Sequence, residues 1–120
     1  MADFDAMPSI DAHAHIFRRD LPMAPGGLTT PHHDFELDAY EAILDRHGVA
    51  SAVIAAPSFL GTYNDYTLAA IRARPRFKTS VILDPITDPY ILKALDADHA
   101  IGVRLSLIGT RTLPDFTSTV

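Results

Sequence analysis

The sequence of 120 residues contains no cysteine. This absence excludes disulfide bonds, thiolate nucleophiles and thiolate metal sites, and it leaves histidine and carboxylate side chains as the candidate metal ligands. Blocks of like charge are also absent, because 10 basic and 15 acidic residues are spread along the chain with a formal net charge of -5. We therefore expect neither nucleic acid nor an anionic membrane surface as a partner.

Long apolar runs are absent as well, since no stretch approaches the roughly 20 residues that a membrane-spanning helix needs. The first eight residues are acidic and lack the basic and apolar regions of a secretion signal. We therefore expect a cytoplasmic protein. A composition of 48% hydrophobic and 21% charged residues is typical of one globular unit with a single core.

Short apolar segments alternate with segments of helical periodicity along the chain. Strands are predicted at residues 9–14, 50–56, 77–83 and 101–107. Helices are predicted at residues 35–47, 64–74 and 88–97, the first with Asp34 as N-cap and Gly48 as its stop. The unbroken apolar run at 50–56 favours a strand buried on both faces. Because each later strand is reached through a helix, the order βαβαβαβ predicts a parallel sheet.

Two segments are predicted to be irregular. The segment 17–34 contains three prolines and two adjacent glycines, which exclude a regular helix or a central strand. At roughly 18 residues it is longer than most connections, and loops of that length tend to be functional or mobile. Residues 109–120 have turn residues and no helical period, so we expect an irregular tail there.

Polar side chains that could take part in catalysis or ligand binding follow the predicted strands at their carboxyl ends. Parallel α/β proteins gather their reactive groups at these ends. The side chains are those of His13, His15, Ser58, Asp84 and Arg104. Two histidines at positions i and i+2 of a strand point to one face, where their imidazoles can clamp a divalent cation. We expect Asp11 on that same face, with Ala12 and Ala14 on the other. The alternative is a pair of histidines that only bind loop backbone. Asp84 precedes a proline and favours a turn.

A series of motifs resembles the amidohydrolase-related superfamily. It begins with Ile-Asp-Ala-His-Ala-His-Ile-Phe at residues 10–17. In chain order it continues with Met23-Ala24-Pro25, His47-Gly48-Val49, Ala56-Pro57-Ser58-Phe59, Gly61-Thr62, Asn64, Leu83-Asp84-Pro85, Gly102-Val103-Arg104-Leu105 and residues 113–118. This succession is similar to the branch that contains 2-pyrone-4,6-dicarboxylate hydrolase and related sugar and sulfomuconate lactonases.

The resemblance implies an α/β fold, namely the first half, about four βα units, of a TIM-type (β/α)8 barrel with parallel strands. Residues 1–120 would then be the N-terminal portion of an amidohydrolase-type barrel and a single incomplete domain. It also implies a hydrolase that acts on a lactone or other cyclic ester of a carboxylated, anionic substrate. A decarboxylase of the same superfamily is a further alternative.

The resemblance also suggests roles for individual residues. His13 and His15 match the pair that holds a divalent, zinc-like metal in most of the superfamily, and that works on the substrate directly, without metal, in the pyrone-dicarboxylate branch. Arg104 matches the arginine that binds a substrate carboxylate, and the alternative for it is a structural salt bridge. Ser58 matches a polar position that can bind substrate, and the alternative is a hydroxyl that caps a turn.

Some features depart from the family pattern. Ser106 stands where the family often has asparagine, Thr29 stands where an aromatic residue is common, and Arg111 alone could supply an additional cation. Only four strands are predicted, whereas a barrel of this type has eight and draws further site residues from the later ones. Two histidines cannot both fix and activate a water molecule, so whether the chain is an enzyme by itself stays open. The alternative is a truncated, inactive fragment or assembly partner. The unpaired first and fourth strands predict self-association through the open barrel edges.

Overall fold

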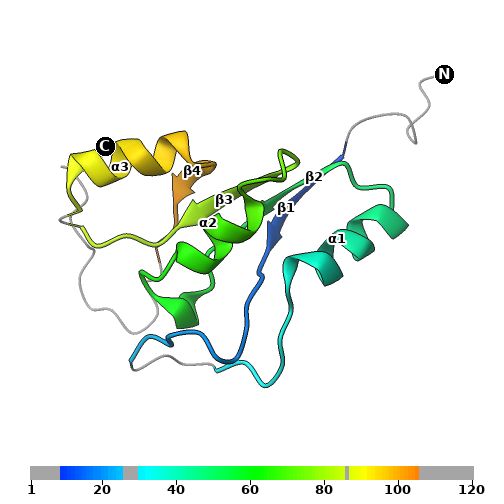
Figure 1. Ribbon diagram of the computed structural model, residues 1–120, viewed down its shortest axis with the longest axis horizontal. Helices are drawn as coiled ribbons and strands as arrows, with labels where there is room; N and C mark the ends of the chain where they lie inside the picture. The colour runs from blue at the N-terminus through cyan, green and yellow to red at the C-terminus, as the bar shows by residue number, and fades with distance from the viewer. Residues whose placement is uncertain (1–8, 26–29, 86, 106–120) are drawn as a thin grey trace.

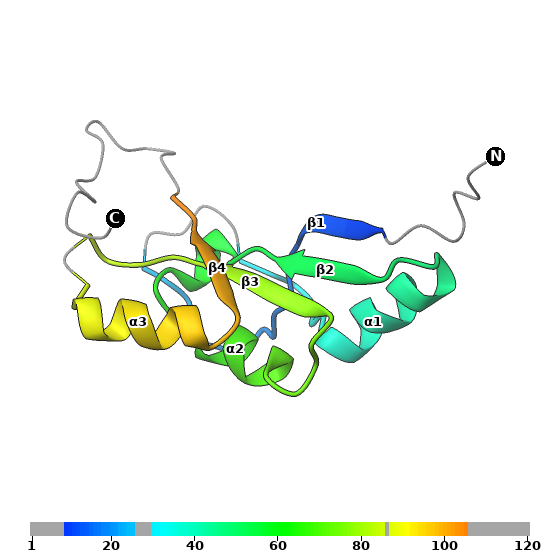
Figure 2. The ribbon, with the colours of Figure 1, turned by 90° about the horizontal axis from the view of Figure 1, so that it is seen from above.

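The computed structural model describes residues 9–25, 30–85 and 87–105, in which four parallel strands form one sheet in the order β1-β2-β3-β4. The strands are β1 (Ile10–Ala14), β2 (Ser51–Ile54), β3 (Phe77–Val81) and β4 (Ala100–Val103). The helices are α1 (Leu37–Arg46), the short 3-10 turn η2 (Ser58–Leu60), α2 (Asp65–Ile71) and α3 (Pro89–Ala97). Figures 1 and 2 show α1, α2 and α3 together on one side of the sheet. The predicted element order and the parallel sheet are confirmed, and η2 was not predicted.

The predicted irregular tail at 109–120 lies outside the described residues, as do Thr29, Ser106 and Arg111. Within the described part of the chain, the segment after β1 contains no helix, and it closes through an isolated antiparallel bridge between Phe17 and Phe35. No helix among the described residues is both long enough and apolar enough to cross a membrane.

The prediction of Asp34 as the N-cap of α1 is wrong. The cap position is Glu36, whose side chain makes no capping bond. The Asp34 carboxylate instead accepts hydrogen bonds from the backbone N–H of Arg19 at 2.8 Å and from its Nε at 3.3 Å. The Asp34 side chain therefore binds Arg19 and does not cap α1. The Phe17–Phe35 bridge keeps the chain extended at Phe35, before the helix begins at Leu37. Gly48 has a φ of +67°, as the predicted helix stop requires.

The hydrophobic core lies between the sheet and the helices α1 and α2. Its members are Ile16, Leu37, Tyr40, Leu44, Ala52, Ile54, Ile71 and Phe77. Along β2 the buried Ala52 and Ile54 alternate with the half-buried Ser51 and Val53. The prediction that this strand is buried on both faces is therefore wrong, because the helices of the described residues cover only one face of the sheet.

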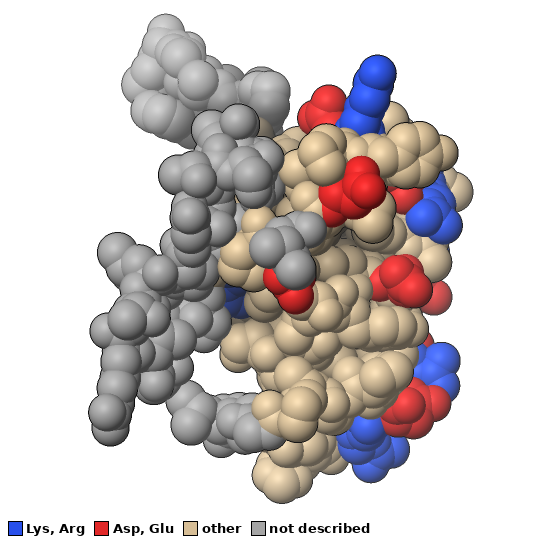
Figure 3. Space-filling model, turned by 90° about the vertical axis from the view of Figure 1, so that its left-hand side faces the viewer, with Lys and Arg blue, Asp and Glu red and all other residues tan. Residues whose placement is uncertain are grey.

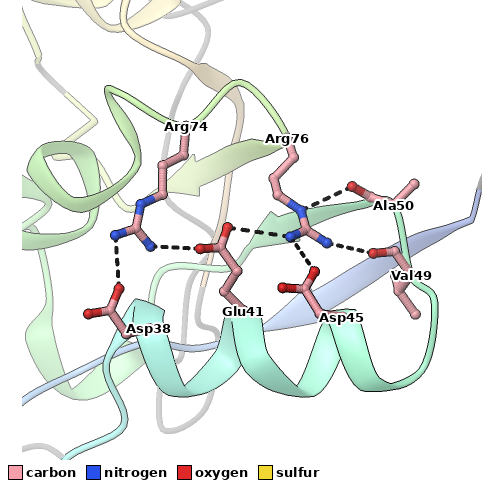
Figure 4. A network of polar contacts seen from close by, with 7 residues as sticks. All are labelled: Asp38, Glu41, Asp45, Val49, Ala50, Arg74 and Arg76. Carbon is pink, nitrogen blue, oxygen red and sulfur yellow. Dashed lines mark hydrogen bonds and ion pairs between the residues drawn. The ribbon is translucent and has the colours of Figure 1, made fainter.

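Two arginines of the turn before β3 tie this turn to α1 (Figure 4). Arg76 donates hydrogen bonds to the carbonyl oxygens of Val49 at 2.7 Å and Ala50 at 3.1 Å. Both arginines also form ion pairs with carboxylates of α1. Arg74 pairs with Asp38 and Glu41, and Arg76 pairs with Glu41 and Asp45. This network lies at the amino end of β3, so the polar residues at the carboxyl ends of the strands are separate from it.

The last helix, α3, is attached more loosely. Asp88 caps it as its side chain accepts from the backbone N–H of Tyr90 at 2.8 Å, but none of its residues is buried. Leu92 and Leu95 line an open groove together with residues of β3 and β4, while Ile91 is 49% exposed. Figure 3 shows the molecule from the left-hand side of Figure 1, and most of the charged side chains on this face lie along its right-hand edge and at the top.

Candidate active site

A bulge in β1 decides which side chains of the first motif share a face. Asp11 pairs with Ala52 and Ala14 pairs with Ile54, so three steps along β1 correspond to two along β2. The extra residue interrupts the alternation of side chains. Asp11 and Ala14 therefore both lie on the helix side, where Asp11 accepts a hydrogen bond from Tyr40 and Ala14 packs against the core.

The two histidine rings lie together, as the spacing predicted. Their centroids are 5.0 Å apart in an edge-to-face arrangement with an interplanar angle of 75°. The prediction that Asp11 accompanies them is wrong, because the bulge between Asp11 and Ala14 turns the carboxylate toward α1. His13 is exposed and His15 is half-buried.

A single backbone contact fixes the orientation of the His15 ring. Its Nδ1 lies 2.7 Å from the carbonyl oxygen of Ala55. Because a carbonyl can only accept, Nδ1 carries the proton and the neutral ring keeps its lone pair on Nε2. Burial lowers the pKa of His15, and the nearby charges of Arg104 and His13 lower this pKa further, against the opposing effect of the bond to Ala55. His15 is therefore held as a neutral imidazole with a free acceptor.

Arg104 is bound to the neighbouring carbonyl. Its backbone N–H donates to Val81 at 2.8 Å, and its Nη1 donates to the carbonyl oxygen of Ala56 at 2.5 Å. The β2 ladder ends at Ile54, and Pro57 supplies no N–H to continue it, so the carbonyls of Ala55 and Ala56 are open to side-chain donors. The structure thus brings His15 and Arg104 onto consecutive carbonyls at the carboxyl end of β2.

Ser58 and Asp84 occupy turns at the same end of the sheet. Ser58 begins η2, is exposed, and follows Ala56 by two residues. The carbonyl of Asp84 accepts from both the N–H and the hydroxyl of Thr87, at 3.0 and 2.5 Å, which confirms the turn predicted there.

Asn64 has a bridging role that periodicity alone could not predict. Its Nδ2 donates to the carbonyl oxygens of Thr62 at 3.1 Å and Ile82 at 3.0 Å, and its Oδ1 accepts from the N–H of Ile82 at 3.3 Å. The side chain therefore fastens the loop after β2 to the end of β3. The available signal was its place among the family motifs, whereas the helical pattern indicated only a helix start.

The long loop after β1 is attached to the same region. The N–H of Ala24 donates to the carbonyl of Phe59 at 2.7 Å, and the rings of Phe17 and Phe59 meet edge to face at 5.4 Å. Gly61 has a φ of +55°, and a Cβ placed there would lie 3.0 Å from the Cβ of Ala24. Only glycine satisfies both conditions without strain, so this close approach packs the two loops together.

The histidine pair alone does not complete a metal centre. His13 and His15 offer two imidazole nitrogens, while catalytic zinc sites use three protein ligands. Across residues 9–25, 30–85 and 87–105, no group of three or more histidine, cysteine or carboxylate side chains is placed to hold a metal ion.

Comparisons with known proteins identify the family and the fold of the chain. Residues 10–111 match a family model described as amidohydrolase. A crystal structure of a provisionally assigned 2-pyrone-4,6-dicarboxylic acid hydrolase from Acinetobacter baumannii, with citric acid bound, is 32% identical with a TM-score of 0.87; the match covers 93% of this chain and 44% of that chain. A second provisionally assigned hydrolase of this name, from Pseudomonas putida, is 34% identical with a TM-score of 0.78 and coverages of 88% and 39%.

A third structure, from Agrobacterium tumefaciens, is 23% identical with a TM-score of 0.73, covers 80% of this chain and 36% of that chain, and supports the fold alone. No curated protein matches the sequence. The chain spans less than half the length of each of these three structures, so its four strands correspond to part of a barrel.

Proposed function

The chain belongs to the amidohydrolase family, and from that premise we propose that it supplies one half of the active site of a hydrolase that opens a carboxylated lactone or similar cyclic ester. The observation that carries this proposal is the placement of His15 and Arg104 on the consecutive carbonyls of Ala55 and Ala56, with the His13 ring beside them. One group accepts a proton and the other carries a permanent positive charge, and ester hydrolysis of an anionic substrate needs both.

The histidine pair provides the acid–base function. The free Nε2 of neutral His15 accepts a proton from the attacking water as its oxygen bonds to the ester carbonyl carbon. When the ring C–O bond breaks, the leaving oxygen takes a proton back, which His15 or the neighbouring His13 can supply. The lowered pKa of His15 keeps it in the basic form at neutral pH. The proposed chemistry uses the imidazoles themselves, and the same two nitrogen donors are what this half of the site would contribute to a divalent metal ion.

Arg104 provides substrate orientation. A guanidinium has five N–H donors in a rigid plane, and the bond to Ala56 uses one of them. The remaining edge can form a bidentate pair with a carboxylate, which is a stronger contact than a single neutral hydrogen bond. Ser58, exposed on the next turn, is proposed as an additional hydrogen-bonding partner for the substrate.

Substrate binding tests this proposal without requiring turnover. Isothermal titration of the chain with 2-pyrone-4,6-dicarboxylate is expected to show saturable binding that Arg104→Ala weakens by about 2–4 kcal/mol, or tens- to hundreds-fold. Arg72→Ala is the matched control, because Arg72 pairs with Asp98 ahead of β4 at the opposite end of the sheet. Equal losses in the two variants, or no binding by the unmodified chain, would contradict the proposal.

Turnover is measured in parallel with a pH-indicator assay on a panel of lactones, with and without added Zn²⁺. We expect any hydrolysis to be lost in both His13→Ala and His15→Ala, and to be independent of Zn²⁺. Binding without turnover would support a chain that holds the substrate but relies on further residues for catalysis. Hydrolysis that both variants retain would remove the acid–base role of the pair.

A further inference from the structure

We propose that Asp11 and Tyr40 are positioning residues for the histidine pair, forming a relay in which the Tyr40 hydroxyl holds the Asp11 carboxylate and that carboxylate holds the backbone of His13. The relay deepens the proposed function and rests on it, because it assigns residues that act through His13 and do not touch the substrate. Neither Asp11 nor Tyr40 was assigned a role in the proposed function.

The first part of the relay is a local turn inside β1. Oδ1 of Asp11 accepts a hydrogen bond from the backbone N–H of His13 at 3.2 Å. A carboxylate that binds the N–H two residues ahead competes with the strand ladder for that donor. The ladder with β2 is irregular over this stretch, between Asp11 and Ala14. The side chain of Asp11 thus stabilises the bulge that places Ala14 against the core and leaves both histidines on the other face.

The second part of the relay fixes the carboxylate from the helix layer. The Tyr40 hydroxyl donates a hydrogen bond to Oδ2 of Asp11. Tyr40 is 5% exposed and packs between the rings of Phe35 and Phe77, with centroids 6.0 and 6.3 Å away. Burial, supported by the bond to Asp11, raises the pKa of Tyr40, so the hydroxyl stays protonated and remains a donor. A rigid core residue thereby sets the position of a strand residue.

The order of these contacts gives the relay a direction. Asp11 uses one oxygen toward α1 and the other toward His13, so a shift of α1 would move the His13 backbone. His15 is anchored independently by the Ala55 carbonyl. The relay is therefore expected to control the placement of His13 relative to His15, and not the orientation of His15 itself.

The chain offers a matched control for removal of the Tyr40 hydroxyl. Tyr66 on α2 also donates its hydroxyl to a carboxylate, with 3.3 Å to Oε1 of Glu36, and it is half-buried. Tyr40→Phe and Tyr66→Phe thus delete the same atom and the same kind of hydrogen bond. Only the first variant touches the relay.

The test is NMR spectroscopy of the labelled 120-residue chain, which requires no turnover. The readouts are the nuclear Overhauser effect between the His13 and His15 rings and the exchange rate of the His13 amide proton. We expect Tyr40→Phe to reduce the ring-to-ring effect at least twofold and to speed amide exchange at least tenfold, while Tyr66→Phe changes neither. The Nδ1 proton of His15 should be unchanged in both variants. Equal behaviour of the two variants would overturn the relay.

A second pair of variants keeps the test decisive if the core responds to Tyr40→Phe. Asp11→Asn retains one side-chain oxygen for the His13 N–H, whereas Asp11→Ala retains none. The relay predicts partial retention of the ring-to-ring effect in Asp11→Asn and its loss in Asp11→Ala. Retention in both would overturn the relay while leaving substrate binding by Arg104 untouched, and loss of substrate binding with an intact relay would count against the proposed function alone.

Discussion

Nδ1 of His15 and the carbonyl oxygen of Ala55 are 2.7 Å apart, and this contact links the end of β2 to the chemistry of the β1 motif. It determines the tautomer of the ring, with the proton on Nδ1 and the lone pair on Nε2. Ala55 contributes its backbone carbonyl and not its side chain. This carbonyl can bind His15 because β2 ends one residue earlier, at Ile54.

The stability of the chain should depend on pH through His15. Its pKa is lowered in the folded chain, mainly by burial, so the unfolded chain binds this proton more readily. The free energy of unfolding should therefore fall as pH decreases through the ordinary histidine value of 6.5 toward the lowered folded value. Urea unfolding at closely spaced pH values measures this slope. His15→Gln should make this slope smaller, and a slope that the substitution leaves unchanged would contradict the account.

Gly61 should tolerate a side chain less well than Gly48. Both have a positive φ, but a Cβ at Gly48 meets nothing within 4 Å while one at Gly61 would lie 3.0 Å from the Cβ of Ala24. Gly48→Ala is expected to cost about 1 kcal/mol from backbone strain alone. Gly61→Ala should cost about 1–2 kcal/mol more, since overpacking adds to the strain. Comparison of urea midpoints checks the difference, and equal costs would show that the two loops are not packed together.

Replacement of His99 by asparagine should destabilise the chain less than replacement by alanine. His99 is the non-glycine residue with a positive φ, +70°, among the described residues, and its Nδ1 is buried without a hydrogen-bond partner there. Both replacements remove the imidazole, but asparagine adopts this left-handed conformation more easily. His99→Asn is expected to exceed His99→Ala in stability by about 1 kcal/mol. Thermal unfolding measures the difference, and the opposite order would contradict the assigned backbone conformation.

The isolated 120-residue chain is proposed to self-associate through β1 and β4. These are the edge strands of the sheet, and Ile10 is 66% and Ile101 59% exposed. Exposed apolar edges with unpaired backbone groups favour pairing with another chain. Sedimentation velocity should show a concentration-dependent mass that Ile101→Lys reduces, with Lys93→Arg as a conservative surface control. A monomer at all concentrations would contradict this proposal.

Most of the fold could be predicted from the sequence because its signals are local. The apolar strand segments, the helical periodicity between them and the stop at Gly48 each depend on residues close in sequence. Asp34 was misassigned because its partner, Arg19, lies fifteen positions away across the loop. No periodicity encodes such a contact.

The candidate site was predictable in part. The spacing of His13 and His15 correctly predicted neighbouring rings, and the position of Arg104 at a strand end placed it in the same region. The bulge that separates Asp11 from the histidines could not be predicted, because the Asp11 carboxylate is bound by the Tyr40 hydroxyl, 29 positions away on α1. Backbone partners such as the Ala55 carbonyl have no signal in side-chain patterns.

The central claim is that His15 presents a neutral Nε2 to the substrate beside Arg104. It is tested most directly by ¹⁵N NMR of the histidine rings at pH 7, before and after addition of 2-pyrone-4,6-dicarboxylate. We predict a protonated Nδ1 and an unprotonated Nε2 in His15, with an Nε2 resonance that shifts on addition of the compound in the unmodified chain but not in Arg104→Ala. A proton on Nε2 of the free chain, or a resonance that the compound leaves in place, would contradict the account.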